Sequence, residues 1–240
     1  MYKNIILLPT YNERNNVKVI IPEIFQLVPE INILVIDDNS PDGTAEEVKQ
    51  LMKIYPNLSI LERKEKTGLG NAYKDAMRRV IKDSEINAVI TMDADGSHSP
   101  EYLKDFLENI KNYDLVIGSR YIAEGGIEDW EFWRKNLSRF GNLYAKILTG
   151  LPANDLTGGF MCIKRALLKE LDFSHIDASG YSFQIELKFY LINKLGAKTK
   201  EIPIIFKSRR EGESKISHHI IREGLIVPWR LFLEKIWKNR

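Results

Sequence analysis

Several features are scarce or missing in this sequence, and each absence excludes a class of protein. The 240 residues include a single cysteine, Cys162, so no disulfide can form within the chain. No run approaches the roughly 20 uncharged apolar residues that cross a bilayer, which excludes a membrane-spanning helix. The first residues lack the pattern of a signal peptide, and internal repeats are absent. We therefore expect a cytoplasmic, globular protein.

Three familiar nucleotide or catalytic motifs are also missing. Gly68-x-Gly70 starts like a dinucleotide fingerprint, but Tyr73 stands at the third glycine position and no glycine-rich turn follows the first strand-like run. Neither a phosphate-binding P-loop nor a Gly-x-Ser-x-Gly elbow occurs. His218 and His219 are adjacent, so they would point in different directions on a helix and make a poor metal-binding pair.

The apolar runs and helical patterns that are present alternate along the chain. This order predicts a mostly parallel α/β sheet with helices on both faces. The expected strands cover 5–8, 33–37, 58–61, 88–93, 115–117 and 200–206. The expected helices cover 13–28, 44–55, 69–81, 100–110, 135–148 and 183–195. Cys162 lies in an apolar context and is expected in the core.

Two of the predicted strands run directly into clusters of acids. Asp37 and Asp38 follow one strand, and Asp93 and Asp95 follow another. Carboxylates beyond the ends of parallel strands stand where open α/β sheets bind ligands. Two hard oxygen donors suit Mg²⁺ or Mn²⁺, and such an ion suits a diphosphate. The alternative is that some of these acids form turns or cap helices. An EF-hand loop is excluded, because Lys104 occupies its bidentate-acid position.

Basic residues follow the last predicted strands. Arg120 comes just after the strand 115–117, so it should face the same crevice as the acids, where a guanidinium fits phosphate. Its alternative is an ordinary surface ion pair. Arg209, Arg210 and Lys215 flank Gly212 in a loop that either closes over a diphosphate or forms a solvated turn.

Charge is placed unevenly, although the net charge is only +2. Residues 206–240 hold nine basic and four acidic residues, so this end carries +5 and the rest −3. From Ile216 onward an apolar stripe alternates with basic residues, and Pro228 interrupts it. Either this helix covers the core of its own domain, or it lies on anionic lipid. We expect a catalytic domain over 1–212 and a basic amphipathic tail over 213–240.

A series of short motifs runs along nearly the whole chain. These motifs are Pro9–Glu13, Asp37–Thr44, Met92–Pro100, Gly118–Tyr121, Trp133–Lys135, Asp155–Phe160, Gly180–Gln184 and Gly212–Lys215. Their order resembles that of the family 2 glycosyltransferases with the GT-A fold. Within that family it is similar to the dolichol-phosphate (polyprenyl-phosphate) mannose synthases, in the form that lacks a transmembrane region.

The resemblance implies a role for individual residues. The base and ribose of the donor would be held by Pro9, Tyr11, Glu13, Ile36 and Asp38. The metal-binding DXD-type motif would be Asp93 and Asp95, with Ala94 beside the nucleotide and Ser97 at a position where some relatives have glutamine. The phosphates of donor or acceptor would be bound by Arg120 and Arg134, and Arg209 and Lys215 would lie on the loop that closes over the donor.

The resemblance also implies an activity. It is the metal-dependent, inverting transfer of mannose from GDP-mannose to dolichyl or polyprenyl phosphate, with Mg²⁺ or Mn²⁺ and without nucleic acid. Two alternatives are a transferase that uses a UDP-sugar such as UDP-glucose, and a non-catalytic subunit that binds a nucleotide sugar. The lipid acceptor implies peripheral attachment to the cytoplasmic face of a membrane. The tail and the aromatic loop Trp130–Trp133 would contact either the lipid surface or a small membrane subunit.

Overall fold

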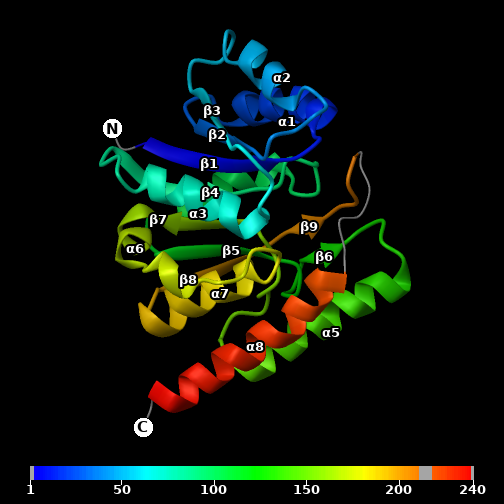
Figure 1. The fold of residues 1–240 in the computed structure, drawn as a ribbon, viewed down its shortest axis with the longest axis vertical. Coiled ribbons are helices and arrows are strands. Elements are labelled where there is room, and N and C mark those ends of the chain that lie inside the picture. The colour runs from blue at the N-terminus through cyan, green and yellow to red at the C-terminus, as the bar shows by residue number, and fades with distance from the viewer. Residues whose placement is uncertain (1–2, 211–217, 239–240) are drawn as a thin grey trace.

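The computed structural model describes residues 3–210 and 218–238 as one α/β unit (Figure 1). Its strands are β1 (Lys3–Thr10), β2 (Asn32–Asp37), β3 (Leu58–Glu62), β4 (Ile86–Thr91), β5 (Leu115–Ser119), β6 (Gly126–Ile127), β7 (Met161–Lys164), β8 (Thr199–Pro203) and β9 (Ile205–Phe206). Its helices are α1 (Arg14–Leu27), α2 (Thr44–Leu51), α3 (Leu69–Val80), α4 (Leu103–Asn109), α5 (Phe132–Thr149), α6 (Arg165–Glu170), α7 (Phe183–Phe189) and α8 (His218–Lys238). Short 3₁₀ turns form at Pro100–Tyr102 and Phe173–His175, and a π-helical turn at Tyr190–Lys194.

Seven strands form the central sheet in the order β3-β2-β1-β4-β7-β5-β8. All neighbours pair in parallel except β7, which is antiparallel to both β4 and β5. This confirms the prediction of a mostly parallel sheet flanked by helices. The sequence did not identify β7, because an apolar run of four residues has too few positions for its period to distinguish strand from helix.

The alternation of side chains along each strand feeds two separate cores. On β1, Ile5 and Leu7 join one apolar cluster while Ile6 and Leu8 join the other. The first cluster includes side chains of α3, α7 and α8, and the second includes those of α1, α2 and α4. Because both faces of the sheet are covered, its strands are apolar throughout, as parallel strands usually are. Cys162 is fully buried, as expected.

Helices α5 and α8 run side by side along the lower edge of the molecule in Figure 1, from its right side toward the lower left. The hydroxyl of Tyr144 donates to the carbonyl of Leu225, and Nζ of Lys235 donates to the carbonyl of Thr149. The residue that contacts α8 first along α5 binds the earlier residue of α8, and the later one binds the later residue, so the two helices are parallel. Over the described ranges, no helix has the length and apolar character needed to span a bilayer.

Candidate active site at the ends of the parallel strands

The ends of β1 and β2 lie next to each other. The two acids at the end of β2, Asp37 and Asp38, have different environments. Pro9 pairs in register with Ile36, and Thr10 pairs with Asp37. Asp37 accepts hydrogen bonds from the Thr10 hydroxyl at 3.0 Å and from the backbone and hydroxyl of Ser40 at 2.9 and 2.6 Å. Its carboxylate is therefore used to build the turn after β2, which is the alternative role that the sequence left open.

Asp38 binds the segment that connects β3 to α3. It is buried and forms an ion pair with Arg63, which also binds Asp75 at 3.0 Å and the Thr67 hydroxyl at 2.6 Å. Burial raises the pKa of Asp38, and Arg63 partly offsets that rise. Arg63 was not identified from the sequence, and it links the end of β2 to the segment that leads into α3.

The segment between β1 and α1 lies against the same strand ends. Glu13 is buried, its backbone N–H donates to the Thr44 hydroxyl at 3.0 Å, and its carboxylate accepts from Asn16 at 2.6 Å. The ammonium of Lys66 lies 3.7 Å from the ring centre of Tyr11, a cation–π contact. The five residues expected to hold the nucleoside therefore come together at one edge of the sheet.

The loop after β4 holds the two candidate metal ligands in different ways. Asp95 is 8% exposed, and its Oδ1 accepts from the backbone and hydroxyl of Ser97 at 3.0 and 2.6 Å. Asp93 is more open, with 28% of its side chain exposed. Ala94, between them, is buried in the core. In this arrangement Ser97 orients the carboxylate of Asp95.

His98 fixes the backbone of this loop. Its Nδ1 accepts a hydrogen bond from the backbone N–H of Asp93 at 3.0 Å, and its ring stacks on Phe160 and meets Phe206 edge-on. Burial lowers the pKa of His98 to about 4, so the ring is neutral and Nδ1 is free of a proton at neutral pH. This role could not be predicted from the sequence, since a lone histidine has many possible environments.

The loop after β9 covers the acidic loop. Nε of Arg209 lies 2.9 Å from Oδ2 of Asp95, and its Nη2 donates to the Tyr181 hydroxyl at 3.2 Å. The backbone N–H of Arg210 donates to the carbonyl of Asp95 at 3.0 Å. Gly96 has a φ of +79°, and an added Cβ would lie 2.9 Å from the Arg210 side chain, so only glycine accommodates this close cover. Lys215 lies outside the described residues.

Arg120 is held rigidly by a buried partner. Its Nε and Nη2 bind the carboxylate of Asp155 at 2.7 and 2.8 Å, and Nη2 also donates to the Thr157 hydroxyl at 2.8 Å. Burial acts to raise the pKa of Asp155, but Arg120 outweighs it and holds that pKa at about 2. The resemblance included Asp155 without giving it a role.

The loop that carries Asp155 is itself fixed by a buried cation. Nζ of Lys188, on α7, donates to the carbonyls of Leu156 and Gly158 at 3.1 and 2.5 Å. Burial lowers the pKa of Lys188 to about 8, even though the Asp155 carboxylate favours its charged form. Arg120, Asp155 and Lys188 thus form one rigid group beneath the site.

Arg134 differs from Arg120 in what it binds. Its guanidinium lies 3.9 Å from the ring centre of Trp130, at the start of α5. Its Nε is buried and has no hydrogen-bond partner among the described residues. A buried donor without a partner is unfavourable, so Arg134 retains hydrogen-bonding capacity for a ligand.

The residues present fit a divalent ion that is shared with a substrate. Asp93 and Asp95 provide hard carboxylate oxygens, and the side chain of Asp93 is partly exposed. Within residues 3–210 and 218–238, no group of three or more His, Cys, Asp or Glu is arranged to hold an ion. The protein would therefore supply part of the coordination, and water and phosphate oxygens the remainder, as is usual for Mg²⁺ at nucleotide sites.

The sheet order and the acidic loop after β4 define the GT-A fold of glycosyltransferases. Solved structures of glucosyl-3-phosphoglycerate synthase from Mycobacterium tuberculosis are similar in fold. One, in complex with Mn²⁺, UDP and glucosyl-3-phosphoglycerate, has a TM-score of 0.67 and 18% identity over 94% of this chain and 80% of that one. Another, with phosphoglyceric acid, has a TM-score of 0.69 at 18% identity, with the same coverage.

The chain belongs to glycosyl transferase family 2, which it matches over residues 5–172, and it is a glycosyltransferase. It is 37% identical to the polyprenol monophosphomannose synthase of Mycolicibacterium smegmatis over 95% of this chain and 86% of that protein. It is 36% identical to the undecaprenyl-phosphate mannosyltransferase of Micrococcus luteus over 97% of this chain and 95% of that protein. The prediction of a family 2 enzyme of the polyprenyl-phosphate mannose synthase type is confirmed.

Proposed function

We propose that this protein transfers mannose from GDP-mannose to a polyprenyl phosphate. The observation that carries the proposal is the Asp95 carboxylate in the loop after β4, which is oriented by Ser97 and bound by Arg209 from the covering loop. Two neighbouring acids can hold a divalent ion, and the ion together with the cation of Arg209 would attract the diphosphate of a nucleotide sugar. The two curated relatives, which are named for mannosyl transfer to polyprenyl phosphates, support the choice of sugar and acceptor.

The donor would lie across the ends of β1, β2 and β4. Pro9, Tyr11, Glu13, Ile36 and Asp38 are the proposed contacts of the base and ribose, because they line the edge where β1 and β2 end. The other proposed contacts of the donor are Asp93, Ala94, Asp95, Ser97, Arg209 and Lys215. A carboxylate such as Asp38, held by Arg63, is a suitable acceptor for donors on a guanine or ribose.

Asp93 and Asp95 would hold Mg²⁺ or Mn²⁺, with Ser97 beside them. When bound, the ion would neutralise charge on the diphosphate leaving group. His98 contributes by fixing the backbone of Asp93, and Ser97 by orienting the carboxylate of Asp95. Arg209 adds a positive charge that is independent of the ion. Burial acts to lower the pKa of Arg209, but Asp95 and Tyr181 raise it on balance, so this side chain remains a cation.

The acceptor would be a phosphate monoester, and this decides what catalysis requires. Its oxygens are already anionic near neutral pH, so the nucleophile does not depend on a strong general base. Catalysis must instead bring the anionic phosphate of the acceptor close to the anionic diphosphate of the donor. Arg134, whose Nε has no hydrogen-bond partner in the part of the chain that the structure describes, is suited to direct contact with the phosphate. Arg120 is neutralised by Asp155, so it would act mainly by holding the wall of the site in place. A single displacement would invert the anomeric carbon and give a β-linked product.

Transfer of label from GDP-mannose tests this function. The purified chain would be incubated with Mn²⁺ or Mg²⁺, radiolabelled GDP-mannose and a short polyprenyl phosphate in detergent. Movement of label into the organic phase supports the proposal. Asp95→Asn should reduce transfer by a hundredfold or more, on the order expected for loss of a charged group at the reacting centre. Asp42→Asn is the matched control, because among the described residues the Asp42 carboxylate accepts hydrogen bonds from the Thr44 side chain and from the backbone N–H groups of Arg14 and Thr44.

Two outcomes would contradict the proposal. Transfer from UDP-glucose but not from GDP-mannose would identify the alternative donor class. Binding of donor without transfer to any lipid phosphate would favour a non-catalytic subunit. The proposed acceptor also places the protein at the cytoplasmic face of a membrane, through its C-terminal region or through a small membrane subunit.

A further inference from the structure

The segment that leads into α7 lies between helices α3 and α8. We call its residues 177–182 the strap. On the α3 side, the backbone N–H of Gly70 donates to the carbonyl of Ser179 at 2.8 Å. A Cβ added at Gly68 or at Gly70 would lie 2.5 Å from the carbonyl oxygen of Ser179 or of Ala178, respectively. The strap therefore lies directly against the start of α3.

Helix α8 holds the other side of the strap. Val227 and Leu231 seat this helix in the core, which is one of the roles that the sequence allowed. From α8, the Glu223 carboxylate accepts hydrogen bonds from the backbone N–H groups of Ser179 at 3.0 Å and of Gly180 at 3.1 Å. A charged acceptor makes stronger hydrogen bonds than a neutral one. One side chain of α8 thus fixes two consecutive peptide groups of the strap.

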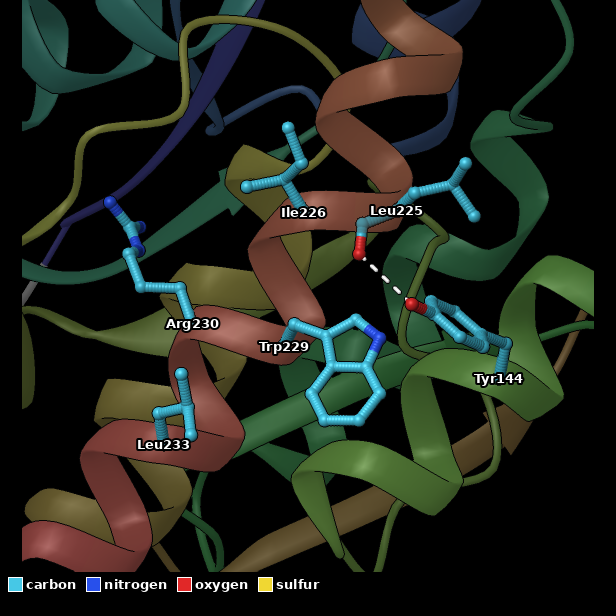
Figure 2. A pocket seen from close by; sticks show the side chains of 6 residues that line it. All are labelled: Tyr144, Leu225, Ile226, Trp229, Arg230 and Leu233. Carbon is cyan, nitrogen blue, oxygen red and sulfur yellow. Dashed lines mark hydrogen bonds between the residues drawn. The ribbon is translucent and has the colours of Figure 1, made fainter.

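The start of the strap is also fixed by α8. Arg230 forms ion pairs with Asp177 and with the buried carboxylate of Glu186. The other oxygen of Glu186 accepts from the backbone N–H of Ala178 at 2.8 Å. Figure 2 shows the Arg230 side chain leaving α8 on the side opposite Tyr144 of α5. Residues 177–180 are therefore each held by a side chain of α8, directly or through Glu186.

The next residue of the strap reaches the candidate site. The Tyr181 hydroxyl accepts from Nη2 of Arg209 at 3.2 Å, and Nε of the same arginine lies 2.9 Å from Oδ2 of Asp95. These two contacts hold the planar guanidinium at two of its nitrogens, which sets its direction as well as its position. A short series of contacts thus leads from Glu223 through the strap to the acidic loop.

We propose that Glu223 is a positioning residue for the donor: it fixes the strap so that Tyr181 holds Arg209 against the donor diphosphate. This inference rests on the proposed function, in which Arg209 contacts that diphosphate. In the described part of the chain, the hydrogen bonds that Glu223 accepts come from the strap backbone. Its effect on the donor would therefore be indirect. A displacement of about 1 Å in a positioning group can impair a site strongly.

Calorimetric titration of the full chain with GDP or UDP, each with Mn²⁺, gives the first test. Glu223→Ala should bind the preferred diphosphate about tenfold more weakly than wild type. The corresponding monophosphate, GMP or UMP, should lose less, because the Arg209 cation acts on the diphosphate. Glu223→Gln should recover part of the loss, since its amide oxygen still accepts a hydrogen bond. This variant also serves where alanine disturbs the fold, as judged by circular dichroism.

The matched control is Glu234→Ala, at another glutamate of the same helix. Glu234 accepts from the Tyr190 hydroxyl at 2.9 Å, so its removal also takes a carboxylate from the contact between α8 and the body of the protein. This control should bind both nucleotides like wild type. An equal loss in the control, or equal losses of diphosphate and monophosphate binding in Glu223→Ala, would show a general structural effect and overturn the proposal.

A double-mutant cycle tests the route of the effect. Tyr181→Phe removes the hydroxyl that accepts from Arg209. In this background Glu223→Ala should weaken binding of the diphosphate by at most about twofold more, because the link through which it acts is already broken. A further tenfold loss would mean that Glu223 acts by another route, which contradicts the positioning role.

A readout without nucleotide separates this inference from the proposed function. The melting temperature would be measured for Glu223→Ala, for Arg209→Met and for the double variant. Groups in one connected network are not additive, so the double variant should lose less than the sum of the single losses. If wild type binds neither nucleotide, the proposed function fails, while the melting temperatures still decide whether Glu223 positions Arg209. Additive losses would overturn the positioning role.

Discussion

Arg209 and Asp95 join two loops that are far apart in the chain: Nε of the arginine lies 2.9 Å from Oδ2 of the carboxylate. The same arginine donates to Tyr181, so its guanidinium connects the acidic loop, the covering loop and the segment before α7. This arginine therefore brings a positive charge into direct contact with the candidate acidic site. Its removal therefore gives a sharp test of how the covering loop contributes.

Replacing Arg209 should impair use of the donor. Arg209→Met removes the cation and both hydrogen bonds, and we expect kcat/KM for GDP-mannose to fall by about a hundredfold. Arg209→Lys should recover only part of this, because an ammonium cannot match the planar fork. The neighbouring Arg210→Met is the control, since its side chain binds Glu23 at the surface. Equal losses at both positions would show that the loop acts only as a cover.

Breaking the Arg120–Asp155 pair should destabilise the protein strongly. Asp155→Asn leaves a buried guanidinium without its countercharge, and loss of one partner of a buried pair costs about 3–5 kcal/mol. The free energy of unfolding from urea denaturation at pH 7 measures this. Asp172→Asn, at an exposed carboxylate, should have little effect. A near-neutral result for Asp155→Asn would mean that Arg120 has another partner.

The same pair should contribute to stability with a defined dependence on pH. The pKa of Asp155 is about 2 in the folded protein, below the value near 4 of an unfolded aspartate. The folded state therefore binds this proton less readily, and the stabilisation is present above about pH 4 and lost as pH falls toward 2. The difference in unfolding free energy between wild type and Asp155→Asn should be constant from pH 5 to 7 and shrink below about pH 4. A difference that does not change with pH would contradict this assignment.

Two glycines in helices should respond in opposite directions to alanine. At Gly70, an added Cβ would lie 2.5 Å from the carbonyl oxygen of Ala178 and 2.9 Å from Cβ of Phe183. Gly70→Ala should therefore force α3 away from the segment before α7 and destabilise the protein by about 1–3 kcal/mol. At Gly141 on α5 an added Cβ would have no atom of the described residues within 4 Å beyond its own helix backbone and chain neighbours, so Gly141→Ala should stabilise the protein by about 0.5–1 kcal/mol through helix propensity. Thermal unfolding of both variants provides the comparison.

The seat of α8 should depend on Arg230. Its guanidinium pairs with Glu186, which is fully buried, and with Asp177. Arg230→Met would leave the Glu186 carboxylate buried and without its cation, and a loss of several kcal/mol is expected. Limited proteolysis should then cut α8 more readily than in wild type. Arg222→Met, at an exposed arginine on the same helix, is the control.

The sequence predicted the sheet and the positions of its acids because both follow from local pattern. The strand expected over 33–37 is β2 (Asn32–Asp37). Parallel strands all end at the same edge of a sheet, so a carboxylate that follows such a strand must lie at that edge. The family resemblance then supplied the class of enzyme. The site roles of individual residues remain predictions.

The side chains that these residues bind could not be predicted from the sequence, because the contacts join positions that are far apart in the chain. Arg63 meets Asp38 across 25 positions of sequence, and Asp155 meets Arg120 across 35. Nothing in the local pattern indicates which charge will bind which. Helix α5 exposes an apolar stripe over residues 132–147, which was missed for another reason: helical spacing is the same whether a stripe faces a core or faces solvent.

The antiparallel strand β7 has a consequence for how the chain folds. It is the only link between β4 on one side and β5 on the other within the described sheet, and it comes after α5 in the chain. Strands β1 to β4 can therefore assemble from local βαβ units, whereas β5 has no neighbour until β7 or β8 has been made. Such non-local pairing is slow relative to local pairing. On a ribosome, the half built from β1 to β4 would form first, and the half that contains β5 and β8 would be completed only when β7 is inserted.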